Sequence, residues 1–216
     1  ILLGQQQKEK AKSASSFCCY ASLIFGLVAG ILILIFMNPL LSLLGSSENT
    51  WQYSKDYLFY IAIGAPFILF SNSFGHAVRG EGAARASMIG GMIGTVANII
   101  LDPIFILTLN MGTAGAAIAT VLGNILACVF YLGFFLTKKS TLSIHPRYFL
   151  SGLDVARRLI TIGLPAGINS ALMSVATILL NNSLVSYGDK PLAAMGIVTK
   201  AYMLIVFIHM GITNGI

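Results

Sequence analysis

The chain has 216 residues, of which 56 % are hydrophobic and only 9 % are charged. Soluble domains carry charge on about 25 % of their residues, so this composition indicates a membrane protein and excludes an ordinary soluble enzyme. The net charge of +6 does not indicate nucleic-acid binding, because the basic residues lie in short connections between apolar segments, where membrane topology explains them.

Six apolar segments are each long enough to cross a bilayer, which takes about 20 residues. They lie at 17–44, 57–78, 86–109, 114–136, 159–186 and 191–216. The connections contain typical helix breakers, such as Gly45-Ser46-Ser47 and Asn110-Met111-Gly112. We therefore predict an all-α, multi-pass bundle of six transmembrane helices in the cell membrane. Because the chain opens on Ile1 without a signal peptide and closes at Ile216 inside an apolar run, we expect it to belong to a longer polypeptide.

Lys and Arg are distributed very unequally between the two sides of the predicted membrane. Ten lie on one side and only Lys55 and Lys190 on the other, and the positive-inside rule places the richer side in the cytoplasm. Residues 1–16 and 138–158 are then cytoplasmic, and the second of these segments is the best boundary between two halves. Within it, Ser151 and Asp154 have the spacing of a capping box, which predicts the start of a helix.

One carboxylate, Asp102, interrupts the third apolar segment and is followed directly by Pro103. A charged group inside a membrane costs about 2.5–3.5 kcal/mol even on insertion scales, so it normally faces a protein interior or a hydrated cavity. Small and polar residues precede it at helical spacing on one face: Ser87, Gly91, Gly94 and Asn98. Asp102 is therefore the leading functional candidate. The alternative is that it only caps backbone groups that Pro103 leaves free.

Polar residues on the other spans indicate helix interfaces or a cavity. In the fourth span, small and polar residues recur at helical spacing, as at an interface: Ala116, Thr120, Gly123, Asn124 and Ala127. The fifth span carries a polar stripe that suits either a hydrated cavity or interhelical hydrogen bonds: Ser170, Ser174, Thr177 and Asn181. Lys200 lies halfway along the sixth span, which favours a position facing a cavity. The candidate substrate-cavity residues are Asn124, Ser174, Thr177, Asn181 and Lys200.

Two further residue types bear on chemistry. His76 lies near Arg79 at the end of the second span, where an interfacial position is expected and a place in a proton path is the alternative. The three cysteines lie in apolar runs without metal-ligand spacing and are expected to be reduced: Cys18, Cys19 and Cys128. The spans contain no paired carboxylates, histidine cluster or phosphate-binding glycine loop, so we do not expect an enzyme.

Several motifs resemble the multidrug and toxic compound extrusion (MATE) transporters. The first-half motifs are Arg79-Gly80-Glu81-Gly82, Asn98-Ile-Ile-Leu101-Asp102-Pro103 and Gly115-Ala-Ala-Ile-Ala-Thr120, and the second-half motifs are Gly163-Leu-Pro-Ala166 and Ala193-Ala-Met-Gly-Ile197. The resemblance implies spans three to eight of a twelve-span, two-lobe transporter. Residues 1–137 would end the first lobe with four spans, 138–158 would link the lobes, and 159–216 would begin the second lobe with two spans.

The resemblance also implies a function and a site. Asp102 and Asn98 would belong to the H⁺ or Na⁺ site of the first lobe, with Thr120 nearby, and the family also uses an acidic residue from a span outside these six. Some branches place another carboxylate where this chain has Met173, so coupling is expected in the first lobe. The expected function is antiport that exports small organic, often cationic, compounds, with H⁺ or Na⁺ as coupling ion and no other cofactor. Its partners would be the lipid bilayer and the remaining spans, without nucleic acid.

A second transporter class has a similar two-lobe design. Flippases for lipid-linked saccharides usually line their cavity with several cationic residues that hold a pyrophosphate. Here only Lys200 is plainly intramembrane, which favours drug export over the flippase.

Overall fold

The computed structural model describes residues 8–137 and 153–215, and within these ranges every regular element is a helix. In chain order the elements are α1 (Lys8–Ile35), α2 (Met37–Leu43), α3 (Trp51–Gly80), α4 (Ala84–Pro103), the π-helix η1 (Ile104–Thr108), α5 (Gly112–Leu136), α7 (Leu153–Val185) and α8 (Asp189–Gly215). The predicted all-α architecture is confirmed.

Five of the six predicted spans have the length and composition needed to cross a membrane. These stretches are Ala11–Ile35, Trp51–Gly80, Ala84–Thr108, Gly112–Leu136 and Gly163–Val185. Helix α8 occupies the sixth predicted segment, but over the described residues its apolar stretch is shorter, Ala193–Val206. The arrangement is that of a multi-pass membrane protein.

The first predicted span differs from the structure at both ends. The segment before residue 17 lies outside the predicted span, yet it forms the first turns of α1 from Lys8 onward. Its small side chains pack inward, with Ser13 and Ser16 almost fully buried. Small hydroxyl residues count as polar in a hydropathy reading but fit a close helix interface, which explains the early start.

The sequence predicts one continuous helix for this span, but the structure has two. Helix α1 ends at Ile35 and α2 begins at Met37, with Phe36 between them outside the α-helical range (φ −100°, ψ 26°). Pro39 lies in the first turn of α2, where a residue without an N–H group is tolerated but cannot continue the hydrogen bonding of a preceding helix.

Helix α4 changes its winding directly after the candidate carboxylate. It ends at Pro103, and the chain continues as the π-helix η1, in which Leu109 N donates to Ile104 O at 2.9 Å. Proline has no N–H to continue the α-helical ladder, and π-helical turns are frequent at functional sites. The helix type therefore changes one residue after Asp102.

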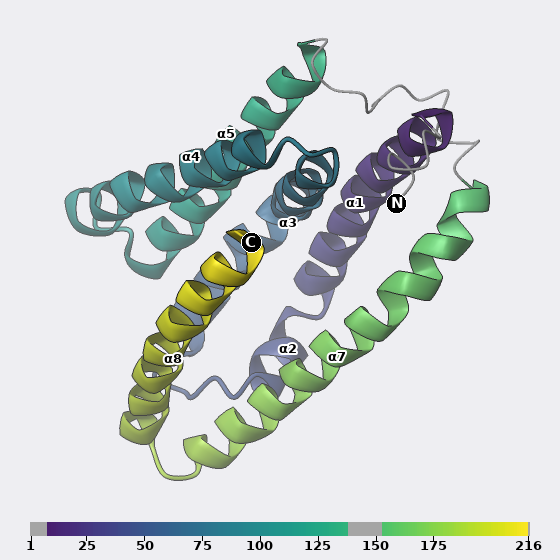
Figure 1. Cartoon of the computed structure of the whole chain (residues 1–216). Helices are drawn as coiled ribbons and strands as arrows, with labels where there is room; N and C mark the ends of the chain where they lie inside the picture. The colour runs from purple at the N-terminus through teal and green to yellow at the C-terminus, as the bar shows by residue number, and fades with distance from the viewer. Residues whose placement is uncertain (1–7, 138–152, 216) are drawn as a thin grey trace.

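Helices α1, α3, α4 and α5 pack into one body (Figure 1). The core is a cluster of buried residues from α1, α3 and α5: Cys19, Phe70, Phe74, Val78, Ala127, Cys128 and Tyr131. The rings of Phe70 and Phe74 stack with centroids 4.2 Å apart. All three cysteines are free thiols, as expected.

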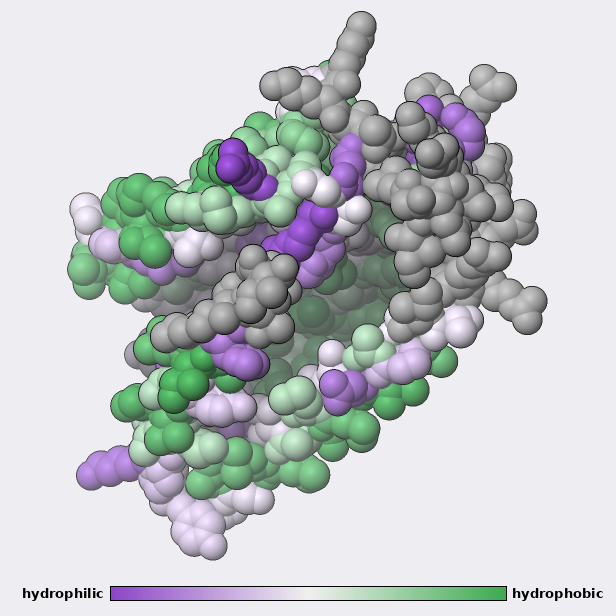
Figure 2. All heavy atoms as spheres, viewed as in Figure 1, coloured by the Kyte–Doolittle hydropathy of each residue, from purple (hydrophilic) through white to green (hydrophobic). Residues whose placement is uncertain are grey.

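Helices α7 and α8 form a hairpin, and α7 also contacts α1 (Figure 1). Figure 2 shows hydrophobic side chains along the outer edge of this hairpin and more hydrophilic ones on the side toward the rest of the molecule. Helix α7 begins at Leu153, inside the segment 138–158 and where the spacing of Ser151 and Asp154 predicts the start of a helix. The predicted linker residues 138–152, including Ser151 of the capping box, lie outside the described residues, so the division into lobes stays a prediction.

Candidate functional site

Asp102, Asn98 and Thr120 lie together where α4 faces α5. The side-chain amide of Asn98 donates from Nδ2 to Asp102 Oδ1 and to Thr120 Oγ1, at 3.3 Å in each case. Asp102 and Asn98 are neighbours because a four-residue step brings two side chains to one face of a helix. Thr120 arrives from the next helix, so Asn98 is the bridge between the two elements. All three side chains are half-buried.

A second amide extends this polar cluster toward α3. Asn124, one turn after Thr120, donates from Nδ2 to the carbonyl oxygen of Thr120 at 2.9 Å. Its Oδ1 accepts a hydrogen bond of 2.6 Å from the hydroxyl of Ser71, which is buried on α3. Polar side chains from three membrane-length helices are thus joined through Asn98, Thr120, Asn124 and Ser71.

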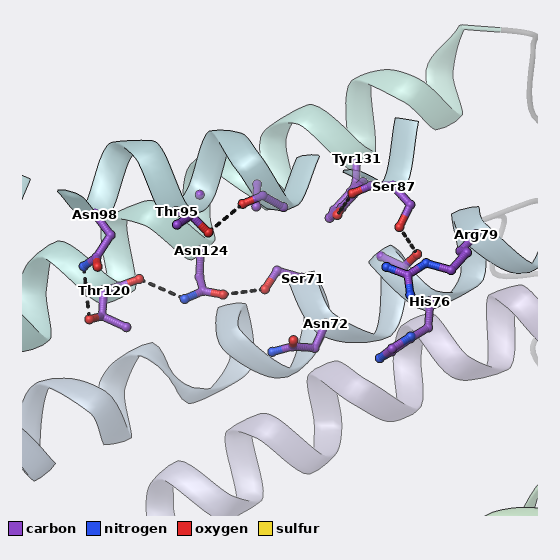
Figure 3. Close-up of a pocket in the computed structure, with 14 residues that line it drawn as sticks. Ser71, Asn72, His76, Arg79, Ser87, Thr95, Asn98, Thr120, Asn124 and Tyr131 are labelled. Atoms are coloured by element: carbon purple, nitrogen blue, oxygen red, sulfur yellow. Dashed lines mark hydrogen bonds between the residues drawn. The ribbon is translucent and has the colours of Figure 1, made fainter. Parts of the chain in front are cut away.

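These side chains border a cavity of about 360 Å³ between α3, α4 and α5 (Figure 3). It is lined by Ser71, Asn72, Gly75, His76, Arg79, Ser87, Gly91, Gly94, Thr95, Asn98, Thr120, Asn124, Ala127 and Tyr131. Asp102 is not among them, so it reaches the cavity through Asn98. Most of the lining side chains are polar, which is unusual inside a membrane and indicates a hydrated space.

The opposite end of the cavity is built around backbone carbonyl groups. Ser87 Oγ donates to Gly75 O at 2.7 Å, and Tyr131 OH donates to Ser87 O at 2.9 Å, which connects α3, α4 and α5. His76 and Arg79 lie beside each other at this end, and both are exposed (Figure 3). His76 lines the cavity, and the choice between an interfacial position and a place in a proton path stays a prediction.

The remaining predicted cavity residues lie on α7 and α8, away from this cavity. Ser174 and Thr177 are exposed, and each donates to its own helix backbone, to Ser170 O at 3.0 Å and to Met173 O at 2.9 Å. Asn181 is half-buried and Lys200 is exposed. The structure therefore places only Asn124 of the five in the α3–α5 cavity, and a substrate role for the other four stays a prediction.

Several lining residues were missed by sequence reasoning, among them Ser71, Thr95 and Tyr131. Ser71 and Asn124 are 53 positions apart, and no local spacing relates them. Tyr131 lies on α5 four residues after Ala127, so an extension of the stripe Thr120, Asn124, Ala127 by one turn would have found it.

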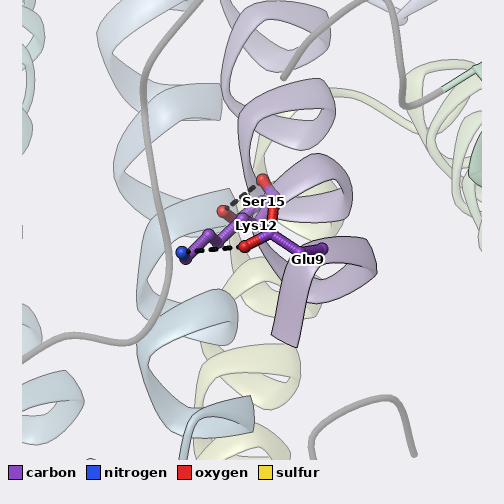
Figure 4. A network of polar contacts seen from close by, with 3 residues as sticks. All are labelled: Glu9, Lys12 and Ser15. Atoms are coloured by element: carbon purple, nitrogen blue, oxygen red, sulfur yellow. Dashed lines mark hydrogen bonds and ion pairs between the residues drawn. The ribbon is translucent and has the colours of Figure 1, made fainter. Parts of the chain in front are cut away.

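Charged and metal-binding groups elsewhere in the described residues do not form a second site. No group of three or more His, Cys, Asp or Glu side chains lies close enough there to hold a metal ion. Near the start of α1, Lys12 Nζ and Glu9 Oε1 form an ion pair of 3.2 Å (Figure 4). Exposed pairs of this kind contribute about 0–1 kcal/mol, so this pair is a surface feature of the helix.

Comparison with known proteins finds one protein family and close structural likeness. The family model described as MatE matches residues 2–104. The chain is 32 % identical over 215 residues to the multidrug export protein MepA of Staphylococcus haemolyticus, covering 100 % of this chain and 48 % of that protein. It thus spans about half the length of the curated relatives it matches.

Two solved structures have the same helix arrangement. One is an inward-facing conformation of a multidrug resistance MATE family transporter of the MOP superfamily, with TM-score 0.81 and 29 % identity, covering 88 % of this chain and 43 % of that one. The other is an outward-facing conformation of such a transporter, with TM-score 0.81 and 28 % identity, covering 95 % and 46 %.

Proposed function

The chain belongs to the multidrug and toxic compound extrusion family, and from that premise we propose that it forms part of a secondary antiporter that exports organic compounds. The coupling ion, H⁺ or Na⁺, would enter the Asp102 cluster from outside and leave to the cytoplasm. Relatives of this family are transporters rather than enzymes, and no catalytic step is proposed.

The observation that carries the proposal is the contact of Asp102 with Asn98 and, through it, with Thr120. A carboxylate in a membrane span is costly unless a cation, a proton or hydrogen-bond donors compensate it. Asn98 supplies such a donor from the same helix. This arrangement suits a group that alternates between a charged state held by the amide and a state neutralised by an ion.

The side-chain amide of Asn98 can respond to that change of charge state by rotating. Its N–H groups face Asp102 and Thr120 as described, and a half-turn of the amide would present its carbonyl oxygen instead. A protonated carboxyl or a bound Na⁺ would favour the carbonyl orientation, because both need an acceptor. Such a turn would replace the Asn98–Thr120 hydrogen bond and so alter the contact between α4 and α5.

The change could spread from there along α4. Pro103 and η1 follow Asp102 directly, and the π-helical turns offer a segment where helix winding can change at low cost. We therefore expect ion binding to bend or rewind α4 near Pro103. This would lower the affinity of the transporter for its organic substrate and release the substrate outward.

The alternative function, flipping of a lipid-linked saccharide, receives less support. The relative named above is described as a multidrug export protein. A pyrophosphate-holding cavity needs several cationic residues, whereas among the described residues the α3–α5 cavity is lined by one arginine, Arg79, and the exposed Lys200 of α8 does not line it. The proposal also includes the substrate sites of the transporter, its remaining spans and its orientation in the plasma membrane. In that orientation residues 1–16 and 138–158 are cytoplasmic.

The test compares full-length transporter in liposomes as wild type, Asp102→Asn and Asp56→Asn. Export of a fluorescent organic cation is followed under an imposed proton gradient and then under a sodium gradient. Asp56 is a suitable control because it accepts a hydrogen bond from Gln52 at 2.9 Å, which an asparagine oxygen can also accept. We expect gradient-driven export in the wild type and in Asp56→Asn, with the effective gradient identifying the ion.

Asp102→Asn should abolish this export while the protein inserts normally. Equal export by Asp102→Asn and wild type would reduce Asp102 to a cap for backbone groups near Pro103. Export of a lipid-linked saccharide in place of the organic cation would instead establish the flippase.

A further inference from the structure

The cavity between α3, α4 and α5 extends from the Asn98–Thr120 contact to the helix ends near His76 and Arg79 (Figure 3). On α4 the lining residues run from Asn98 back to Ser87, eleven positions, or about 16 Å at 1.5 Å per residue. On α3 they run from Ser71 to Arg79, eight positions, or about 12 Å. The cavity thus covers roughly half the hydrocarbon thickness of a bilayer, which is about 30 Å.

The lining suits water along this whole distance. A volume of about 360 Å³ has room for on the order of ten waters at ~30 Å³ each. Hydroxyl or amide groups occur on all three surrounding helices: Ser71 and Asn72 on α3, Ser87, Thr95 and Asn98 on α4, and Thr120 and Asn124 on α5. Cavities in proteins stay dry when their walls are apolar and fill when polar partners are available, so this one is expected to fill.

The two ends of the cavity differ in charge. The inner end of the polar chain touches Asp102 through Asn98, which attracts a cation. The other end carries the exposed guanidinium of Arg79 beside His76. A positive charge at the mouth raises the local potential and disfavours a cation that enters from that side. The gradient of charge therefore favours retention at Asp102 and hinders entry through the mouth.

We propose that this cavity is a water-filled passage through which the coupling ion leaves the Asp102, Asn98 and Thr120 cluster toward the His76 and Arg79 end of the bundle. The inference rests on the proposed antiport function and adds the exit route and the end of the bundle at which it opens. The positive charge of Arg79 at that end raises the barrier to a cation equally in both directions, so the direction of net flow comes from the ion gradient across the membrane.

Gly91 offers a sharp probe of the passage. It lines the cavity, and a Cβ atom built on it meets no other atom within 4 Å, so a cysteine side chain fits without displacement. Val129 on α5 is the matched control: it is 61 % exposed and does not line the cavity. Gly91 lies seven residues from Ala84 at the start of α4, and Val129 lies seven from Leu136 at the end of α5, so both lie at the same depth.

The experiment uses full-length transporter in oriented vesicles, as wild type, Gly91→Cys and Val129→Cys. A membrane-impermeant, bulky thiol reagent is applied to each side in turn, and the rate of labelling above the wild-type background is measured. Thiols react as thiolates, which form in water and scarcely in lipid. We expect Gly91→Cys to react from the cytoplasmic side about tenfold or more faster than Val129→Cys, and ion-driven export to be lost as the adduct forms.

Three results would overturn the proposal. Slow labelling of Gly91→Cys from both sides would mean that the cavity is dry or covered by other spans of the transporter. Fast labelling only from the outer side would reverse the direction. Fast cytoplasmic labelling without loss of export would leave a hydrated cavity that is not the ion route. If Gly91→Cys fails to insert, Thr95→Cys serves as a second probe, because Thr95 also lines the cavity and is close to cysteine in size.

The experiment distinguishes a wrong assignment of the passage from a wrong assignment of the antiport function. Labelling rates do not depend on transport, whereas absence of export by unlabelled wild type under both gradients would refute the antiport function alone.

Discussion

Gly123 on α5 lies against Gly94 on α4 so closely that a Cβ atom on Gly123 would be only 2.5 Å from the carbonyl oxygen of Gly94. Because the atom in the way belongs to the backbone, no side-chain rotation can make room. One turn away on each helix, Asn98 reaches Thr120 with a hydrogen bond of 3.3 Å. The close approach of the two glycines is therefore what brings the polar cluster together.

We predict that Gly123→Ala separates α4 from α5 and weakens the cluster. Inserting a methyl group into a tight contact costs about 1–3 kcal/mol, so the thermal unfolding temperature in detergent should fall, and ion-driven export with it. Gly133→Ala on the same helix is the control, because a Cβ atom there meets nothing within 4 Å. That variant should unfold at or above the wild-type temperature, since alanine has the higher helix propensity. Equal unfolding temperatures of the two variants would contradict the predicted steric origin.

A second pair of glycines tests the packing at the other end of the cavity. A Cβ atom on Gly90 would overlap the ring of Tyr131, whereas one on the adjacent Gly91 meets nothing. Gly90→Ala should therefore lower the unfolding temperature and Gly91→Ala should not. Combining Gly90→Ala with Tyr131→Leu should cost less than the two single losses added together, because the smaller side chain removes the overlap. Strict additivity of the two substitutions would show that Gly90 and Tyr131 do not compete for the same space.

The hydrogen bond between Asn98 and Thr120 can be measured by a double-mutant cycle. Asn98→Ala and Thr120→Val should be coupled by about 0.5–1 kcal/mol in the free energy of unfolding, as is typical of interhelical hydrogen bonds in membranes. Thr177→Val provides the comparison, because Thr177 donates to its own helix at Met173 O and lies on α7. Its effect should add to that of Asn98→Ala. A coupling near zero for Asn98 and Thr120 would mean that water replaces their contact at no cost.

We expect one hydrogen bond between α7 and α2 to hold these two helices at a fixed distance. Asn182 Nδ2 donates to the carbonyl oxygen of Leu43, at the end of α2, at 2.9 Å. Asn182→Asp removes the donor and places a negative charge beside that carbonyl group, so the two elements should separate. Spin labels at the exposed residues Glu48 and Tyr187 would report this as a longer distance by double electron–electron resonance.

Ser183→Ala is the control for this measurement, because Ser183 donates to its own helix at Leu179 O. It should leave the distance between the labels unchanged. An unchanged distance in Asn182→Asp as well would mean that this hydrogen bond does not hold α7 against α2.

The sequence alone determined the features that depend on composition and on spacing within one helix. A long apolar run with few charges is stable in a bilayer as a helix that spans it. Composition and length therefore identify the membrane-spanning segments. Asp102 and Asn98 share a face because they are four residues apart in one helix. The small residues around Gly94 and Gly123 indicated a close interface because large side chains would keep the helices apart. None of these conclusions required knowledge of which helices are neighbours.

Tertiary structure decided everything that depends on how separate helices cross. Ser71 meets Asn124 and Tyr131 meets the carbonyl group of Ser87 only because α3, α4 and α5 converge, and no pattern in the chain encodes that geometry locally. The early start of α1 and its division from α2 also escaped sequence reasoning. Buried serines resemble a loop in a hydropathy pattern, so packing decided where α1 begins. The division from α2 follows from Pro39, which cannot continue the hydrogen bonding of α1.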